Sequence, residues 1–129
     1  MNYLEEEIDH ALNTLCISSK KLDSTEIATL IHSLTKKFFR LESTLLDPVE
    51  LNAKNTEHNP NFWQEIQYRV SEENLVLLVC DSAYRAWKIH DAQDIAAVLG
   101  ETIGYTFWIT DNNLTFLLHM DDHDCVIWA

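Results

Sequence analysis

The residues that could support chemistry are concentrated near the C-terminus. Three carboxylates and an imidazole stand together in Asp121-Asp122-His123-Asp124, with His119 shortly before them. Such side chains can hold a divalent ion, but zinc sites usually show spaced ligand pairs, and calcium loops alternate acids around a glycine. Neither pattern is present. We therefore interpret the segment as a charged turn or a contact for a partner, and expect no metal or other cofactor.

Catalysis by a thiol is a second option, because Cys80 and Cys125 occur in the same chain as His90 and His123. A catalytic cysteine needs a local activating environment. Cys80 ends an apolar run and Cys125 begins one, which favours buried structural thiols. Sequence motifs of serine hydrolases, zinc proteases, nucleotide-binding loops and dinucleotide-binding folds are also missing. We expect a protein that is not an enzyme; a metal-dependent or thiol enzyme stays a further alternative.

The net charge of −12 restricts the classes of partner. Nucleic acids and anionic lipid surfaces attract lysine and arginine, so direct binding to either is disfavoured. A basic protein would instead be steered toward this chain. The alternative is that the acidic surface only keeps the protein in solution.

The position of the charge is more informative than its total. From Ile89 to Ala129 the sequence has no lysine or arginine, yet it holds seven of the 21 acidic residues. Helix caps and one turn account for some of them, whereas the three nearest the C-terminus exceed what a turn requires. If all seven lie together in the fold, and none pairs with Lys36, Lys37 or Arg40, they form an acidic face that can bind a cationic partner. The seven are Asp91, Asp94, Glu101, Asp111, Asp121, Asp122 and Asp124.

The four tryptophans could anchor an interface, although tryptophan in a small domain usually belongs to the core. Trp108 alternates with Tyr105, Phe107 and Ile109 in a strand-like segment. It is the best exposed candidate if no helix covers its face. The predicted partner-binding residues are Trp108, Asp111, Asp121, Asp122, His123 and Asp124.

Four helices are predicted from apolar residues at helical spacing, at about residues 2–18, 24–45, 61–70 and 92–103. Asp23 with Glu26, and Asp91 with Asp94, have the spacing of helix N-caps. Gly104 is placed to end the fourth helix. The second helix is expected to carry apolar residues as far as Leu45 and to stop at Pro48.

Strands are predicted where the apolar residues no longer follow helical spacing. Leu75–Cys80 is a continuous apolar run, typical of a strand buried on both faces, and residues 84–89 form a second strand. Alternation then predicts a meander of residues 105–110, 114–119 and 125–128, with turns at 111–113 and 121–124. The expected fold is α+β, with N-terminal helices on a mainly antiparallel sheet of about four or five strands ending in this meander. Residues 1–129 form a single domain.

The cellular location is predicted from what the sequence lacks. Three cysteines without paired spacing indicate reduced thiols, and the acidic N-terminus does not look like a secretion signal. No apolar run is long enough to span a bilayer. We expect a cytoplasmic protein that does not enter a membrane.

This profile resembles the small acidic immunity proteins of bacterial toxin systems, including contact-dependent growth inhibition. The likeness concerns size, charge and α+β build, and it is carried by residues 105–111, 114–118 and 122–124. It implies capture of one cognate, basic toxin, commonly a nuclease, by blocking its active site or an outer surface. The other hypothesis is a non-catalytic adaptor or regulatory subunit, either monomeric or homodimeric.

Overall fold

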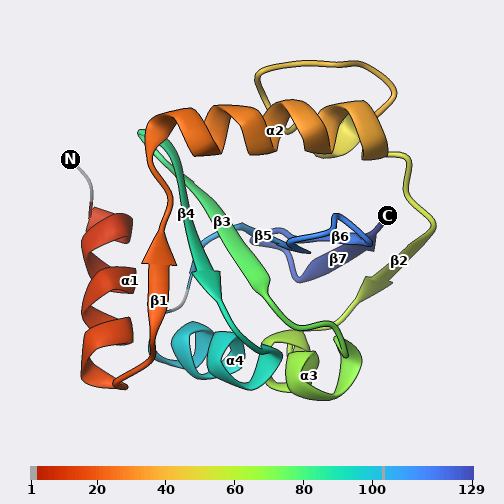
Figure 1. Ribbon diagram of the computed structural model, residues 1–129. Helices are drawn as coiled ribbons and strands as arrows, with labels where there is room; N and C mark the ends of the chain where they lie inside the picture. Colours follow the sequence, from red (N-terminus) through yellow and green to blue (C-terminus); the bar gives the residue numbers. More distant parts are fainter. Residues whose placement is uncertain (1–2, 103) are drawn as a thin grey trace.

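The computed structural model describes residues 3–102 and 104–129, which form helices on both sides of a seven-stranded antiparallel sheet (Figure 1). The helices are α1 (Tyr3–Thr14), α2 (Ser24–Phe38), the 3-10 helix η1 (Pro48–Glu50), α3 (Phe62–Arg69) and α4 (Ala92–Glu101). The strands are β1 (Ser19–Lys21), β2 (Asn55–His58), β3 (Leu75–Asp81), β4 (Ala83–Ile89), β5 (Phe107–Asp111), β6 (Leu117–Met120) and β7 (Cys125–Trp128). Their order in the sheet is β1-β4-β3-β5-β6-β7-β2.

This arrangement confirms the predicted α+β class, the antiparallel sheet and the C-terminal meander. Strand β3 lies between β4 and β5, and Leu75 to Val79 are all buried, as the continuous apolar run predicts. Alternate side chains point to opposite faces. Val76 and Leu78 therefore join the core under α2, whereas Leu75, Leu77 and Val79 join the core under α1, α3 and α4.

Helix α2 and the segment after it, with buried Phe39, Leu46 and Leu51, cover one face of the sheet. A capping box at Asp23 and Glu26 starts the helix, and Ile27, Ile31 and Leu34 form its buried stripe. The other three helices share the opposite face, where Ile8, Phe62, Ile66, Ile95 and Val98 are buried. Among the described residues, no helix combines the length and the apolar character needed to cross a membrane.

The prediction that the second helix reaches Leu45 is wrong, because α2 ends at Phe38. Phe38 and Phe39 are adjacent and both buried, which an extended backbone allows more readily than one helical face. Phe39 pairs with Leu51 in an isolated bridge, and Asn52 N–H donates to the Phe38 carbonyl. Tertiary pairing thus overrides the helical period, and Leu45 is exposed.

The two outermost strands, β1 and β2, were not predicted. The first helix ends at Thr14 instead of near residue 18, and β1 follows it; β2 lies in the segment expected to be a loop. Both strands are short and mostly exposed, so their sequences lack an apolar alternation. Backbone pairing with β4 and β7 alone defines them. The predicted helix start at Asn2 and the assignment of Ile103 to the fourth helix lie outside the described residues.

Replacement of Leu34 by alanine tests whether α2 holds this face of the sheet. Leu34 is fully buried, so Leu34→Ala is expected to lower the free energy of unfolding by about 2–5 kcal/mol through lost burial and a cavity. The control is Leu41→Ala just after the helix, where the side chain is exposed and the change should stay within about 0.5 kcal/mol. Urea denaturation measures both. Equal effects of the two substitutions would contradict the packing described.

Candidate functional site

The acidic turn of residues 121–124 joins β6 to β7 and is held in one conformation. Asp121 Oδ1 accepts hydrogen bonds from the backbone N–H groups of His123 at 2.8 Å and Cys125 at 2.9 Å. The Asp121 N–H donates to the Cys125 carbonyl at 3.0 Å. Asp124 has a φ of 64°, a left-handed conformation that aspartate tolerates better than most residues. The turn therefore presents its carboxylates from a fixed backbone.

A hollow of about 220 Å³ lies beside this turn. Asp121, Asp122 and Asp124 are among its lining residues, and Trp63 and Tyr105 contribute aromatic surface. No lysine or arginine is among its described lining residues. The combination of an acidic rim with aromatic walls suits a cation that also carries an apolar stem.

The aromatic walls are positioned by α4. Gly100 lets the Trp63 indole lie against this helix, because a Cβ at that position would stand 2.8 Å from an indole carbon. Thr102 Oγ1 donates to the Val98 carbonyl at 2.8 Å and lies 2.7 Å from the Tyr105 hydroxyl. Burial raises the pKa of Tyr105 to about 12, so its hydroxyl keeps its proton at neutral pH. Sequence reasoning missed this half of the site, since no local pattern links residues 63, 100 and 105.

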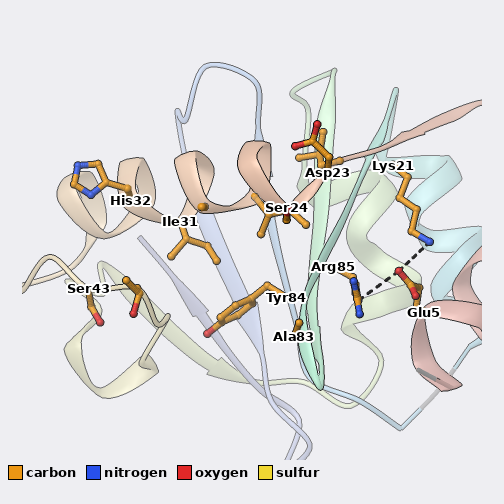
Figure 2. A pocket seen from close by; sticks show the side chains of 14 residues that line it. Glu5, Lys21, Asp23, Ser24, Ile31, His32, Ser43, Ala83, Tyr84 and Arg85 are labelled. Atoms are coloured by element: carbon orange, nitrogen blue, oxygen red, sulfur yellow. Dashed lines mark ion pairs between the residues drawn. The ribbon is translucent and has the colours of Figure 1, made fainter. Parts of the chain in front are cut away.

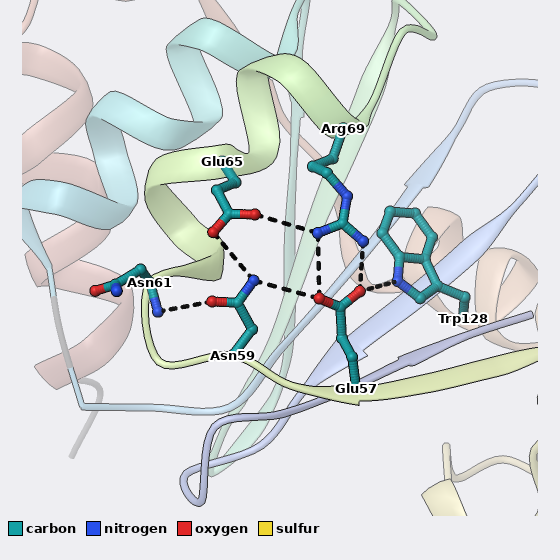
Figure 3. Close-up of polar contacts among 6 residues, drawn as sticks. All are labelled: Glu57, Asn59, Asn61, Glu65, Arg69 and Trp128. Carbon is teal, nitrogen blue, oxygen red and sulfur yellow. Dashed lines mark hydrogen bonds and ion pairs between the residues drawn. The ribbon is translucent and has the colours of Figure 1, made fainter.

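A polar network of side chains from β2 and α3 and the segment between them (Figure 3) is hydrogen-bonded to the same turn. The Arg69 guanidinium of α3 pairs with Glu57 of β2 and with Glu65, and the Asn59 amide donates to both glutamates. Hydrogen bonding to Arg69 lowers the pKa of Glu57. The backbone N–H of Asn59 in turn donates to the Asp124 carbonyl at 2.8 Å. The two carboxylates of this network share one guanidinium, and the network helps to position the turn through Asn59.

The structure divides the seven acids of the C-terminal third between the two ends of the sheet, so the expectation of one continuous face is wrong. Leu75 pairs with both Ile89 and Asp111, which places Asp111 at the end where α4 begins. Met120, which precedes the acidic turn, pairs with Phe107 at the opposite end of β5. Asp91 and Asp94 lie at the first end, where the Asp91 side chain accepts a hydrogen bond from the Asp94 N–H. Glu101 ends α4 beside the hollow-lining Leu99 and Thr102.

The same seven acids are not paired with the basic end of α2. Within residues 3–102 and 104–129, no ion pair joins any of them to a lysine or arginine. In the part of the chain that the structure describes, the ionic contact found at the turn is between His123 Nε2 and Asp122 Oδ1, 3.7 Å apart. Both side chains are largely exposed. The three carboxylates of the turn therefore have no lysine or arginine partner in the described part of the chain.

Two of the predicted partner-binding residues are buried. Asp111 accepts hydrogen bonds from the backbone N–H and the hydroxyl of Thr115, at 2.7 and 2.6 Å, and thereby holds the β5–β6 turn. Trp108 packs under α2 against Phe39 and stacks on His119 with ring centroids 4.0 Å apart. Neither side chain offers a contact surface in this fold, whereas Asp122 and His123 are exposed and Asp121 and Asp124 are partly exposed.

Two observations concern the metal and thiol alternatives. The described residues contain no group of three or more histidine, cysteine or acidic side chains arranged to hold a metal ion. Cys80 and Cys125 are exposed, which corrects the expectation of buried structural thiols. Cys80 lies next to the turn between β3 and β4, and Cys125 is the first residue of β7, after the acidic turn. No protein-family model, curated protein or solved structure was found to match this chain.

The stacked His119 makes folding pH-dependent. Burial lowers the pKa of His119 below its unfolded value near 6.5, outweighing the effects of the Phe107 carbonyl and of Asp121. As pH falls through that value, the unfolded chain takes up the proton first. This histidine therefore costs no stability at neutral pH. Toward pH 5 the free energy of unfolding decreases, by at most about 1.4 kcal/mol per pH unit for one group.

Urea denaturation at several pH values tests this assignment. His119→Gln should reduce the loss of unfolding free energy between neutral pH and pH 5, because the protonation that favours the unfolded chain is removed. His123→Gln is the matched control, since its side chain is exposed and should leave the wild-type slope in place. An identical pH dependence in wild type and His119→Gln would show that another group is responsible.

Proposed function

We propose that this protein is an immunity-type inhibitor, which binds a basic bacterial toxin in the cytoplasm through the acidic turn and does no catalysis itself. The observation that carries the proposal is the hollow that Asp121, Asp122 and Asp124 help to line. Its carboxylates have no lysine or arginine partner among the described residues, although the chain pairs other acids with Lys21, Arg69 and Arg85. Unpaired like charges in one place favour a cation from outside the molecule.

A nuclease is the toxin class that fits this chemistry best. An enzyme that acts on nucleic acid needs lysines and arginines to bind phosphates. The aromatic walls and acidic rim of the hollow match the apolar stem and charged head of such a side chain. The net charge of −12 supplies long-range attraction toward the same surface.

The second candidate is a non-catalytic adaptor or regulatory subunit. It is favoured by apolar side chains that stay exposed in the segment after α2, namely Leu41, Leu45 and Val49. Exposed apolar groups can mark a protein contact. The neighbouring gene discriminates the two functions: a secreted toxin gene supports the first, and an operon of metabolic enzymes supports the second.

Association kinetics with the protein encoded next to this gene test the acidic surface. The variant combines Asp121→Asn, Asp122→Asn and Asp124→Asn. Asparagine keeps the oxygen that accepts the turn hydrogen bonds of Asp121 and tolerates the left-handed backbone of Asp124. We expect biolayer interferometry to show association slowed about tenfold at low salt, with a flatter dependence on ionic strength.

The matched control removes the same charge elsewhere, with Glu6→Gln, Glu42→Gln and Glu73→Gln at exposed positions. It should retain most of the association rate, because distant charges are screened. Equal rates for all three proteins would exclude the turn as the interface. A neighbouring toxin that neither binds this protein nor is neutralised by it would overturn the proposed function.

A further inference from the structure

A second hollow, of about 470 Å³, lies away from the acidic turn and shares no lining residue with the smaller hollow there. It is bounded by the first half of α2, the start of β4, the loop at Ser43 and Thr44, and Glu5 of α1 (Figure 2). The edge of β4 is open here because β1 pairs only with Trp87 to Ile89. Pockets for small molecules commonly enclose about 300–1,000 Å³, so this hollow has the size of a ligand site.

One part of the hollow is apolar and ends in hydroxyl groups. Ile27 and Ile31 of α2 line it, and the Tyr84 side chain extends from β4 toward Ser43 (Figure 2). The Tyr84 hydroxyl accepts a hydrogen bond from the Leu46 N–H at 2.9 Å. Burial raises the pKa of Tyr84, so the hydroxyl keeps its proton at neutral pH. This part can enclose an apolar group of moderate size.

The other part contains charged groups of both signs. Glu5 Oε2 lies 2.9 Å from Lys21 Nζ and 3.4 Å from Arg85 Nε (Figure 2). The fourth charged lining residue, Asp23, caps α2. Two cations and two anions therefore give this lining no net charge, in contrast to the acidic turn.

Arg85 is incompletely satisfied in this arrangement. Its Nε is buried and is the one side-chain nitrogen or oxygen atom in the described part of the chain that is both buried and without a hydrogen bond. The contact with Glu5 is ionic and lacks hydrogen-bond geometry. Because Nε has almost no accessible surface, a ligand in the hollow cannot contact this atom. The Arg85 side chain as a whole is 28% exposed and lines the hollow, so a ligand oxygen there would meet the other guanidinium nitrogens.

We propose that this hollow binds a free α-amino acid with an apolar side chain. The ligand carboxylate accepts hydrogen bonds from the Arg85 guanidinium, its ammonium group pairs with Glu5, and its side chain lies against Ile27, Ile31 and Tyr84. A zwitterion keeps the local charges balanced. A carboxylate alone would be placed beside Glu5, and an amine alone would be placed beside Lys21 and Arg85, so each would meet a like charge.

Isothermal titration calorimetry with the full chain tests the proposal. L-Leucine and L-phenylalanine are the probes; 4-methylpentanoate and 3-methylbutylamine are leucine analogues lacking the ammonium and the carboxylate, respectively. We expect saturable binding of at least one amino acid and at least about tenfold weaker binding of both analogues, since each loses one charged hydrogen-bonding group. Arg85→Gln should weaken amino-acid binding by a similar factor.

Filling the hollow gives a test that leaves Arg85 in place. Ala28 is exposed on α2 and lines the hollow, so Ala28→Trp should abolish binding while the protein stays folded. Ala97→Trp on α4 is the matched control at an exposed helical position outside the hollow, and should bind as the wild type does. Absence of saturation up to about 10 mM, equal binding of 4-methylpentanoate, or undiminished binding by Ala28→Trp would each overturn the proposal.

Discussion

Strand β3 is buried on both faces of the sheet, and the rest of the fold supplies the cover that its side chains need. Its two sets of alternating side chains enter separate cores, one under α2 and one under α1, α3 and α4. Burial of apolar surface is worth roughly 25 cal/mol per Å², so leaving either face open would expose much of the stabilising surface. This requirement explains why Trp108, on the α2 side of the neighbouring strand, is a core residue and offers nothing to a partner.

The same sheet decides which acids can act together. In an antiparallel meander, the residues after β5 and the residues after β6 lie at opposite ends of the strands. Asp111 is therefore separated from Asp121, Asp122 and Asp124, although only nine residues lie between Asp111 and Asp121 in the sequence. Because the acids of the C-terminal third are divided between the two ends of the sheet, they repel one another less. Asp111 is also satisfied locally by its hydrogen bonds from Thr115. Within residues 3–102 and 104–129, the β6–β7 turn brings together three carboxylates that form no ion pair with a lysine or arginine.

The features predictable from sequence are those with a local physical cause. The Asp23 capping box, the buried run of β3 and the C-terminal meander each depend on side chains close in sequence. All three are present, although the middle strand of the meander starts at Leu117 and not at Leu114. β1 and β2 depend on backbone pairing with distant strands, and the end of α2 depends on the bridge between Phe39 and Leu51. The candidate site divides in the same way: the charged turn is visible in sequence, whereas its aromatic walls require the contact of α3 with α4 at Gly100.

The rigidity of the acidic turn bears on how it can bind. A flexible charged loop loses conformational entropy on binding, whereas a turn held by its own hydrogen bonds has already lost it on folding. Asp121 holds two backbone N–H groups, and Asn59, itself fixed by the Arg69 network, holds the Asp124 carbonyl. These bonds keep three like charges together against their repulsion. A cation in the adjacent hollow relieves that repulsion. Binding of a basic partner would therefore also stabilise the folded turn.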